Sequence, residues 1–478
     1  MKSNTTVTSI DLTYNEIQKE GAQFLIECLK SNSTLTSIDL EDHIGIFINT
    51  LAKKMQTFDL SEKKIGDEEV QFIFECLKSN STITSVNLSN NDMTNEGAQF
   101  ISECLKVNFA ITLINISNNQ IEEEGAQYIS ESLKFNTQVT SIDLSNNQIR
   151  DEGAQFISEC LKANSTITSL NLKNNQIGEN GAKFLSESLA SNSTITSINL
   201  SSNKVGKEGA LFLSDCLKTN SSITSINLTN LKIGKEGTQL ISNCLKLNST
   251  ITSIYLEDNQ MEKEGAHFIS DCLKVNSTIT SINLAGNDIG DEGVLFIAEC
   301  LKSNSSITSI NLQRNGIAKT GVKFISESLK LNSKINTILL SNNEIGHEGA
   351  QFLSDCLKTN PAITTITLSN NKIEKEGAQH LSECLKLNST ITSITLDMND
   401  IGDKGAQLIG ESLKTNSTLT AIDLGWNSIG NEGANFIVEC LKSNSTITSI
   451  PLEDNNVGKK GLQLILECLQ LNALKNKK

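Results

Sequence analysis

The sequence of 478 residues is poor in proline, arginine and aromatic residues. It has two prolines (Pro361 and Pro451), two arginines (Arg150 and Arg314) and one tryptophan. No run of 18 apolar residues occurs, so the sequence predicts no membrane span. Its net charge of −15 is spread along the chain, and a basic stripe is missing. This charge distribution argues against nucleic acid as the main partner.

Signals for secretion are also missing. The repeat pattern begins within a few residues of Met1, at Asn4–Val7, which leaves no room for a secretory signal peptide. Many loops read Asn-Ser-Thr or Asn-Ser-Ser, as at Asn80, Asn192 and Asn444, and these triplets are formal glycosylation sequons. We interpret them as turn residues. The sequence therefore predicts a cytoplasmic protein, or one in the host cytosol if it is a delivered bacterial effector.

A period of 28 residues dominates the chain. Fifteen copies run from Met55 to Leu474 without insertion or deletion, and unit positions are counted here from Met55. Apolar residues fall at positions 1, 4, 6 and 11, asparagine at 9, glycine at 15 and a second apolar set at 18, 19, 22 and 23. Such a period is typical of a solenoid. We predict one domain, 1–478, of about 17 repeats, with irregular repeats in 1–54, in-register repeats in 55–474 and a basic tail in 475–478.

Each unit has a strand half and a helix half. Positions 1 to 6 alternate between apolar and polar residues, as in 195–200, so Ile198 and Leu200 should be buried while Ser197 and Asn199 face outward. Asn203 at position 9 should bind loop backbone groups and align with its equivalents in a ladder. The segment 151–162 has apolar residues at helical spacing.

The two halves predict an α/β fold. Gly153 should allow close packing at the helix start, and Asn164 should cap the helix end in a left-handed conformation. Strands lie about 4.8 Å apart and helices about 8–10 Å apart, so the stack must curve. We expect a curved right-handed solenoid with a parallel sheet on the concave face and helices on the convex face. Pro451 at position 5 should lie in the last strand, with its missing N–H on the open edge.

All twelve cysteines fall at position 22 of the repeat, where Ser132, Ser188, Ser328 and Ser412 replace them in other units. Stacked helices hold this column too far apart for disulfides, and the spacing typical of zinc ligands is missing. We therefore predict reduced, buried thiols in a reducing compartment, and no cofactor or metal.

The pattern L-x-x-L-x-L-x-x-N-x-L-x-x-x-G recurs in nearly every unit, for instance from Ile223 to Gly237, where Leu231 replaces the asparagine. This pattern resembles the ribonuclease-inhibitor-like leucine-rich repeats over essentially the whole chain. Related repeats occur in the sensing regions of NOD-like receptors and in Ran GTPase-activating proteins. The resemblance implies a horseshoe-shaped solenoid with a binding role, and it does not select among the several binding functions that this fold hosts.

One unit near the N-terminus is short. The spacing from Leu40 to Leu60 is 20 residues, and the segment from His43 to Lys54 replaces part of the normal loop and helix. A degenerate terminal repeat would explain this spacing, and so would a notch that accepts a partner.

Ser, Asn, Ser and Asn are the commonest residues at positions 3, 5, 7 and 8, and they should form a uniform polar surface on the concave face and its rim. Departures gather in the C-terminal half, and Trp426 occupies a rim position that Tyr14 holds in the first repeat. Aromatic residues and arginine often anchor interfaces, although single exposed aromatics are also common. The candidate partner-binding residues are Tyr255, Glu257, Asp258, Arg314 beside Gln313, Asp397, Met398, Trp426 beside Gly425, Glu453 and Asp454.

No catalytic constellation is visible, because the four histidines occupy unrelated unit positions and no phosphate-binding glycine motif occurs. We therefore predict a non-enzymatic protein-binding scaffold or sensor. The resemblance also admits an activator or regulator of a Ran-like small GTPase. Against this alternative stand the longer array of repeats, a single concave arginine and a basic end (Lys475, Lys477, Lys478) where those activators typically have an acidic tail.

Overall fold

A computed structural model describes residues 6–12, 15, 21, 24–26, 28–29, 34–35, 37–39 and 55–475. These residues form two compact units, Met1–Leu231 and Lys232–Lys478. The boundary falls inside one 28-residue repeat, and the single domain expected over 1–478 stays a prediction. Tyr14, the segment from His43 to Lys54 and the last three residues lie outside the described part of the chain.

Each described strand is three residues long and begins at position 3 of its repeat. The first unit holds β1 (Ser9–Asp11), β2 (Ser37–Asp39), β3 (Thr57–Asp59), β4 (Ser85–Asn87), β5 (Leu113–Asn115), β6 (Ser141–Asp143), β7 (Ser169–Asn171), β8 (Ser197–Asn199) and β9 (Ser225–Asn227). The second holds β10 (Ser253–Tyr255), β11 (Ser281–Asn283), β12 (Ser309–Asn311), β13 (Thr337–Leu339), β14 (Thr365–Thr367), β15 (Ser393–Thr395) and β16 (Ala421–Asp423).

One helix follows each strand from β3 onward. The first unit has α3 (Asp67–Leu77), α4 (Asn95–Leu105), α5 (Glu123–Leu133), α6 (Arg150–Ala163), α7 (Glu179–Leu189) and α8 (Gly206–Thr219). The second has α9 (Gly234–Leu245), α10 (Glu262–Leu273), α11 (Gly290–Leu301), α12 (Lys319–Leu329), α13 (Gly346–Leu357), α14 (Glu374–Leu387), α15 (Gly402–Leu413), α16 (Asn431–Ser443) and α17 (Lys459–Lys475).

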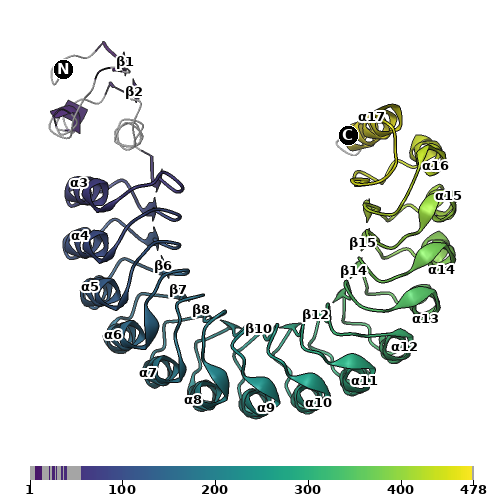
Figure 1. Cartoon of the computed structure of the whole chain (residues 1–478), viewed down its shortest axis with the longest axis horizontal. Coiled ribbons are helices and arrows are strands. Elements are labelled where there is room, and N and C mark those ends of the chain that lie inside the picture. Colours follow the sequence, from purple (N-terminus) through teal and green to yellow (C-terminus); the bar gives the residue numbers. More distant parts are fainter. Residues whose placement is uncertain are drawn as a thin grey trace. The chain divides into compact units, whose positions relative to one another are not determined.

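Within each unit, β1 pairs with β2, and the strands from β3 onward pair with their neighbours, in parallel and in register. Residues 28 apart therefore face each other, as Ser253 and Ser281 do. Within each unit the strands line the inner side of an arc and the helices its outer side (Figure 1). Ile198 and Leu200 are 1% exposed, while Ser197 and Asn199 are half-buried on the opposite face. The predicted parallel sheet, helical layer and curvature are confirmed within each unit. Among the described residues, no helix is long and apolar enough to cross a membrane.

The asparagine ladder at position 9 is confirmed. Asn287 donates from Nδ2 to the carbonyl of Leu256 in the preceding repeat at 2.9 Å, and its Oδ1 accepts the N–H of Asn259 at 2.8 Å. Each such amide therefore joins two repeats through backbone groups that a loop cannot pair by itself. In the repeat from Ile223 this place is taken by Leu231, whose buried apolar side chain offers no acceptor.

A second asparagine ladder runs along the loops after the helices, at position 26. Asn164 donates from Nδ2 to the carbonyls of Leu133 and Asn136, at 2.7 and 3.1 Å, and its Oδ1 accepts the N–H of Thr166 at 2.9 Å. The predicted left-handed cap is wrong, because Asn164 has φ −79° and ψ 131°. An extended backbone turns the side chain inward, where it satisfies carbonyls at the end of the preceding repeat's helix.

The helices begin in two ways, and position 13 of the preceding repeat selects between them. Asp403 Oδ1 accepts the N–H groups of Gly430 and Gly433 at 2.6 and 2.8 Å, and Gly430 is extended with φ −96°. Lys375, at the same position one repeat earlier, offers no such acceptor. The helix of the next repeat then begins at Gly402, whose backbone is left-handed with φ 59°. Further side chains that accept the next repeat's N–H in this way are Asp67, Asn95, Asp151, Asp291 and Asn431.

All twelve cysteines are free thiols. Nine are buried, but Cys28, Cys76 and Cys468 are only half-buried, so the expectation of a uniformly buried column is wrong for these three. Cys468 lies on α17, which has a neighbouring helix only on its α16 side in the described chain.

Pro451 does not lie in a strand. The last repeat has an isolated bridge between Ala421 and Ser449, and no strand follows it in the described chain. The Ser449 N–H donates toward Thr420 in the preceding repeat, at 3.2 Å, and residues two apart in a strand point their N–H groups to the same side. The missing N–H of Pro451 therefore faces β16, not the open edge. The parallel ladder between the last repeat and β16 therefore lacks the hydrogen bond that an N–H at this position would donate.

Candidate functional site

The rim of the sheet has an unusual backbone. At position 8 every in-register repeat has a positive φ, between 51° and 63°. Asparagine tolerates this left-handed conformation better than other residues with a side chain, which explains why it is common there. Bulky residues at this position, such as Arg314, Met398 and Trp426, occupy a conformation that disfavours them. Sequence reasoning missed this cost, although the recurrence of asparagine at position 8 was the available signal.

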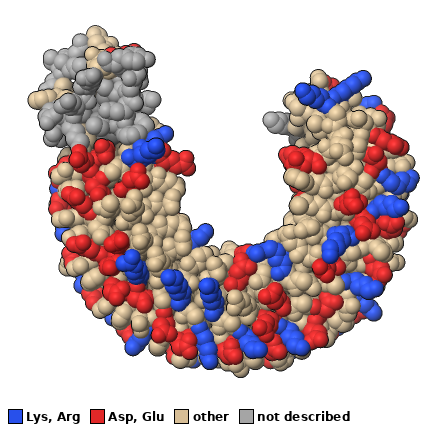
Figure 2. All heavy atoms as spheres, in the orientation of Figure 1, with Lys and Arg blue, Asp and Glu red and all other residues tan. Residues whose placement is uncertain are grey.

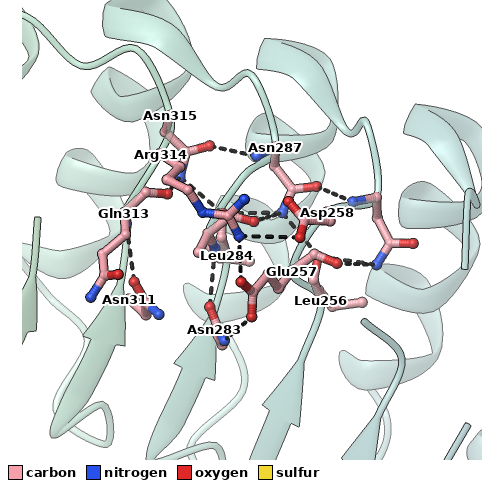
Figure 3. Close-up of polar contacts among 12 residues, drawn as sticks. Leu256, Glu257, Asp258, Asn283, Leu284, Asn287, Asn311, Gln313, Arg314 and Asn315 are labelled. Atoms are coloured by element: carbon pink, nitrogen blue, oxygen red, sulfur yellow. Dashed lines mark hydrogen bonds and ion pairs between the residues drawn. The ribbon is translucent and has the colours of Figure 1, made fainter. Parts of the chain in front are cut away.

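The candidate residues form two groups, and the first surrounds Arg314 (Figure 3). Its Nη2 atom lies 2.5 Å from Glu257 Oε1 and 3.1 Å from Asp258 Oδ2. Glu257 also accepts a hydrogen bond from Asn283 Nδ2, at 3.1 Å. The hydrogen bonds to Asp258 and Glu257 raise the pKa of the Arg314 guanidinium. The arginine is thus already paired with acids of its own chain.

Gly286 makes this contact possible. It holds position 8 in the repeat between those of Asp258 and Arg314, with φ 63°. A Cβ atom there would lie 1.9 Å from Asp258 Oδ1 and 3.2 Å from Arg314 Nη2. Any larger residue would therefore displace the carboxylate. Tyr255, 37% exposed, lies beside this group, opposite Asn283 in the β10–β11 pair.

The second group lies at the C-terminal end of the second unit, around Trp426. Met398 and Trp426 hold the rim position in successive repeats, and their side chains are 47% and 56% exposed. The Met398 N–H donates to the carbonyl of Gly425 at 3.0 Å, which fixes the two rim segments side by side. An apolar pair therefore replaces the asparagines found at this rim elsewhere.

Acidic side chains lie next to this pair. Asp397 and Glu453 hold position 7 in the repeats on either side of Gly425, which has no side chain to place between them. Asp423 on β16 lies beneath, and its Oδ1 accepts the Gly425 N–H at 2.9 Å. Burial, with the negative charges of Asp397 and Glu453, raises the pKa of Asp423 above its usual range.

No cation of the described chain neutralises these acids. Among the described residues, no lysine or arginine forms an ion pair with Asp397, Asp423, Glu453 or Asp454. Within the same part of the chain, no three acidic, histidine or cysteine side chains are placed to hold a metal ion. In Figure 2 acidic side chains reach the inner edge of the second unit near its C-terminal end.

Most cysteine thiols are poorly suited to nucleophilic chemistry. Burial raises the pKa of eight thiols to about 12, namely those of Cys104, Cys160, Cys216, Cys272, Cys300, Cys356, Cys384 and Cys440. Such thiols are poor nucleophiles at neutral pH. Hollows lie between neighbouring helices on the outer side, as between α7 and α8, where Lys183 Nζ is 5.8 Å from the Phe212 ring.

Comparison with known proteins bears on the repeat itself. The family model of the leucine-rich repeat matches residues 3–25, 79–102, 135–158, 163–186, 191–214, 275–298, 303–326, 387–410 and 415–438. These segments are leucine-rich repeats. Among curated proteins, no sequence matches the chain.

Solved structures of leucine-rich-repeat proteins are similar in fold. TLR13 in a complex with ssRNA13 is 14% identical, with a TM-score of 0.55, over 92% of this chain and 63% of that one. LegL7 of Legionella pneumophila is 19% identical, with a TM-score of 0.42, over 60% of this chain and 94% of that one. An internalin of Listeria monocytogenes is 17% identical, with a TM-score of 0.43, over 80% and 93%. At this identity the likeness to TLR13 concerns the fold alone.

Proposed function

We propose that this protein is a non-enzymatic protein-binding scaffold or sensor that recognises its partner with the inner face and rim of the second unit. One observation carries the proposal, namely the adjacent exposed side chains of Met398 and Trp426 on a left-handed rim. Tryptophan is a frequent interface anchor, and leucine-rich repeats generally serve as binding scaffolds.

The cost of this arrangement supports a role in binding. A left-handed residue with a bulky side chain costs about 1–2 kcal/mol, and asparagine at the same place costs less. Such local strain tends to persist at functional sites. Met398 and Trp426 are exposed, so packing inside the fold offsets little of this cost.

Arg314 is a weaker candidate for an anchor, because Glu257 and Asp258 already bind its guanidinium. A partner would have to displace two carboxylates to use it. We therefore assign the main contact to Met398, Trp426 and their acidic neighbours, and a peripheral one to the group around Tyr255.

The test replaces Trp426 with asparagine, which suits the rim backbone. Proteins that cross-link to the full chain are identified for three versions of it: the parent, Trp426→Asn and Asn342→Ser. The Asn342→Ser protein is the control, because it changes the same rim position in another repeat. A true partner is retained by the parent and the control, and the variant binds it at least about thirtyfold more weakly. Equal retention by all three would place the site elsewhere, with the segment from His43 to Lys54 as the next candidate.

A reducing compartment such as the cytosol fits the proposal. The sequon asparagine Asn444 is 4% exposed, and its Nδ2 donates to the carbonyls of Leu413 and Asn416 at 2.7 and 2.8 Å. A glycan on this nitrogen would remove these bonds. The free thiols point the same way.

Regulation of a Ran-like small GTPase is the alternative function. An activator that supplies an arginine to the reaction would need a free guanidinium, whereas that of Arg314 is paired. A GTP hydrolysis assay with Ran separates the two functions. A scaffold leaves the rate unchanged, and an activator increases it.

A further inference from the structure

Two acidic groups on the inner face of the second unit differ in how their charge is balanced, and this difference bears on the partner in the proposed function. Glu257 and Asp258 are both paired with Arg314, which reaches them from two repeats away. Asp397 and Glu453 have no such counterpart among the described residues. Their charges instead oppose the ionisation of Asp423 between them.

At position 7, Gly425 leaves a gap between the side chains of Asp397 and Glu453. Position 7 carries a serine in many repeats, but Gly425 leaves that place without a side chain. Gly425 has no positive φ, so its backbone does not require glycine. A Cβ atom there would lie 3.3 Å from Asp423 Oδ1, 3.4 Å from the backbone carbonyl oxygen of Glu453 and 3.8 Å from the Cβ of Asp397, so a side chain would fit only if these neighbours shifted slightly. Glycine avoids these close contacts, and it also leaves the place between Asp397 and Glu453 without a side chain.

We infer that this face binds a protein segment that presents a lysine or arginine next to an apolar side chain. The cation enters above Gly425, between Asp397 and Glu453, and takes the role that Arg314 has in the other group. The apolar side chain packs against Met398 and Trp426 on the adjacent rim. Asp397 accepts a hydrogen bond from Ser369 Oγ, but neither it nor Glu453 has a cationic partner among the described residues. Such carboxylates beside an exposed tryptophan complement the segment in charge and in polarity.

Other occupants fit less well. Phosphate groups of a nucleic acid would meet Asp397, Glu453 and Asp454, which repel them. A metal ion would need three ligands close together, and the described residues provide no such set. A second copy of this chain could offer a lysine, and the test distinguishes it.

The experiment uses the single tryptophan, Trp426, as a probe within the site. The full chain is panned against a phage-displayed library of random dodecapeptides, and synthetic versions of the enriched peptides are titrated while tryptophan emission is recorded. We expect enriched peptides to pair lysine or arginine with an aliphatic or aromatic neighbour. We also expect them to shift the emission, and to bind more weakly as salt concentration rises.

Variants then locate the contact. Asp397→Asn combined with Glu453→Gln should weaken binding about tenfold. Gly425→Ser, which restores the residue common at this position, should weaken it by a similar factor because it fills the gap. Glu383→Gln combined with Glu411→Gln is the matched control, since it removes two exposed carboxylates from the outer helices α14 and α15 and should leave the affinity unchanged.

The outcomes separate this inference from the proposed function. If peptides without basic residues shift the emission and bind the acid variants as tightly as the parent, the cationic partner is overturned. The proposed binding role of the rim is then retained. Labelled peptides that bind Trp426→Asn as tightly as the parent, or a library that yields no binder, overturn both. Concentration-dependent dimerisation that the acid variants abolish would identify a second copy as the occupant and also overturn the inference.

Discussion

The Nη2 atom of Arg314 lies 3.1 Å from the carboxylate of Asp258, although 56 residues separate them in the sequence. This spacing is two repeats, so the contact passes over the repeat between them. Gly286 lies at the crossing point, where its missing Cβ leaves the carboxylate in place. A charge cluster on this solenoid thus depends on a glycine as much as on the charged residues.

Substitution of Gly286 tests this dependence. Gly286→Ala should destabilise the protein by about 1 kcal/mol for the left-handed backbone, plus up to about 1 kcal/mol for the disturbed exposed ion pairs. Gly316→Ala is the control, because Gly316 has the same φ of 63° and a Cβ atom added to it would have no other atom within 4 Å. Urea unfolding midpoints measure both. Equal shifts would show that the ion pairs of Arg314 contribute nothing to stability.

Much of this architecture could be predicted from the period, because each repeat buries its apolar residues only against its neighbours. The strand, the helix and the asparagine at position 9 were predicted for this reason. The second ladder, at Asn164 and its equivalents, was missed because Asn-Ser-Thr also describes an ordinary turn. Its signal was the presence of asparagine at position 26 in all fifteen in-register repeats.

The candidate site was harder to predict. Departures from the repeat located Arg314 and Trp426, but one of these side chains is paired with its own chain and the other is not. Spacing alone cannot show this difference, because the pairing of Arg314 depends on acids in a repeat two units away and on Gly286 between them. Pro451 was misplaced for a similar reason, since the direction of an N–H in a strand follows from register and not from edge position.

Bulky residues at the left-handed rim position, such as Trp426, should lower the free energy of unfolding. Trp426→Asn should raise the free energy of unfolding by about 0.5–1 kcal/mol, because asparagine adopts the left-handed conformation at lower cost. The reverse change at an ordinary rim position, Asn230→Met, should lower it by a similar amount. Thermal unfolding midpoints report both. A Trp426→Asn protein that is less stable than the parent would show that tryptophan packs usefully within the fold.

Thiol reactivity should follow burial. Ellman's reagent at pH 8 should label the half-buried Cys76 and Cys468 first, while the eight thiols whose pKa burial raises to about 12 should react only after unfolding. Cys300→Ser should fold normally, because Ser188 at the same unit position donates from Oγ to the carbonyl of Leu185 at 2.8 Å. Rapid labelling of all twelve thiols in the native protein would contradict the buried column.

Asp423 should make stability depend on pH. Burial and the charges of Asp397 and Glu453 raise its pKa in the folded protein above the unfolded value of 3.8, so the folded state binds the proton more tightly. Its contribution to stability is therefore present at low pH and is lost as pH rises through the folded pKa. Asp423→Asn should stabilise the protein at pH 7 and have little effect below pH 4. Equal effects at both pH values would contradict this linkage.

The helix starts provide a test of coupling between repeats. Asp403→Ala removes the acceptor for the N–H groups of Gly430 and Gly433 at the start of α16, and loss of such a cap costs about 1 kcal/mol. Lys375→Ala, at the same unit position one repeat earlier, should change stability by less than about 0.5 kcal/mol, because the lysine side chain accepts no N–H. Hydrogen exchange should also show faster opening at the start of α16 in the aspartate variant alone. Unchanged exchange there would mean that water replaces the carboxylate without cost, and that position 13 does not select how the next helix begins.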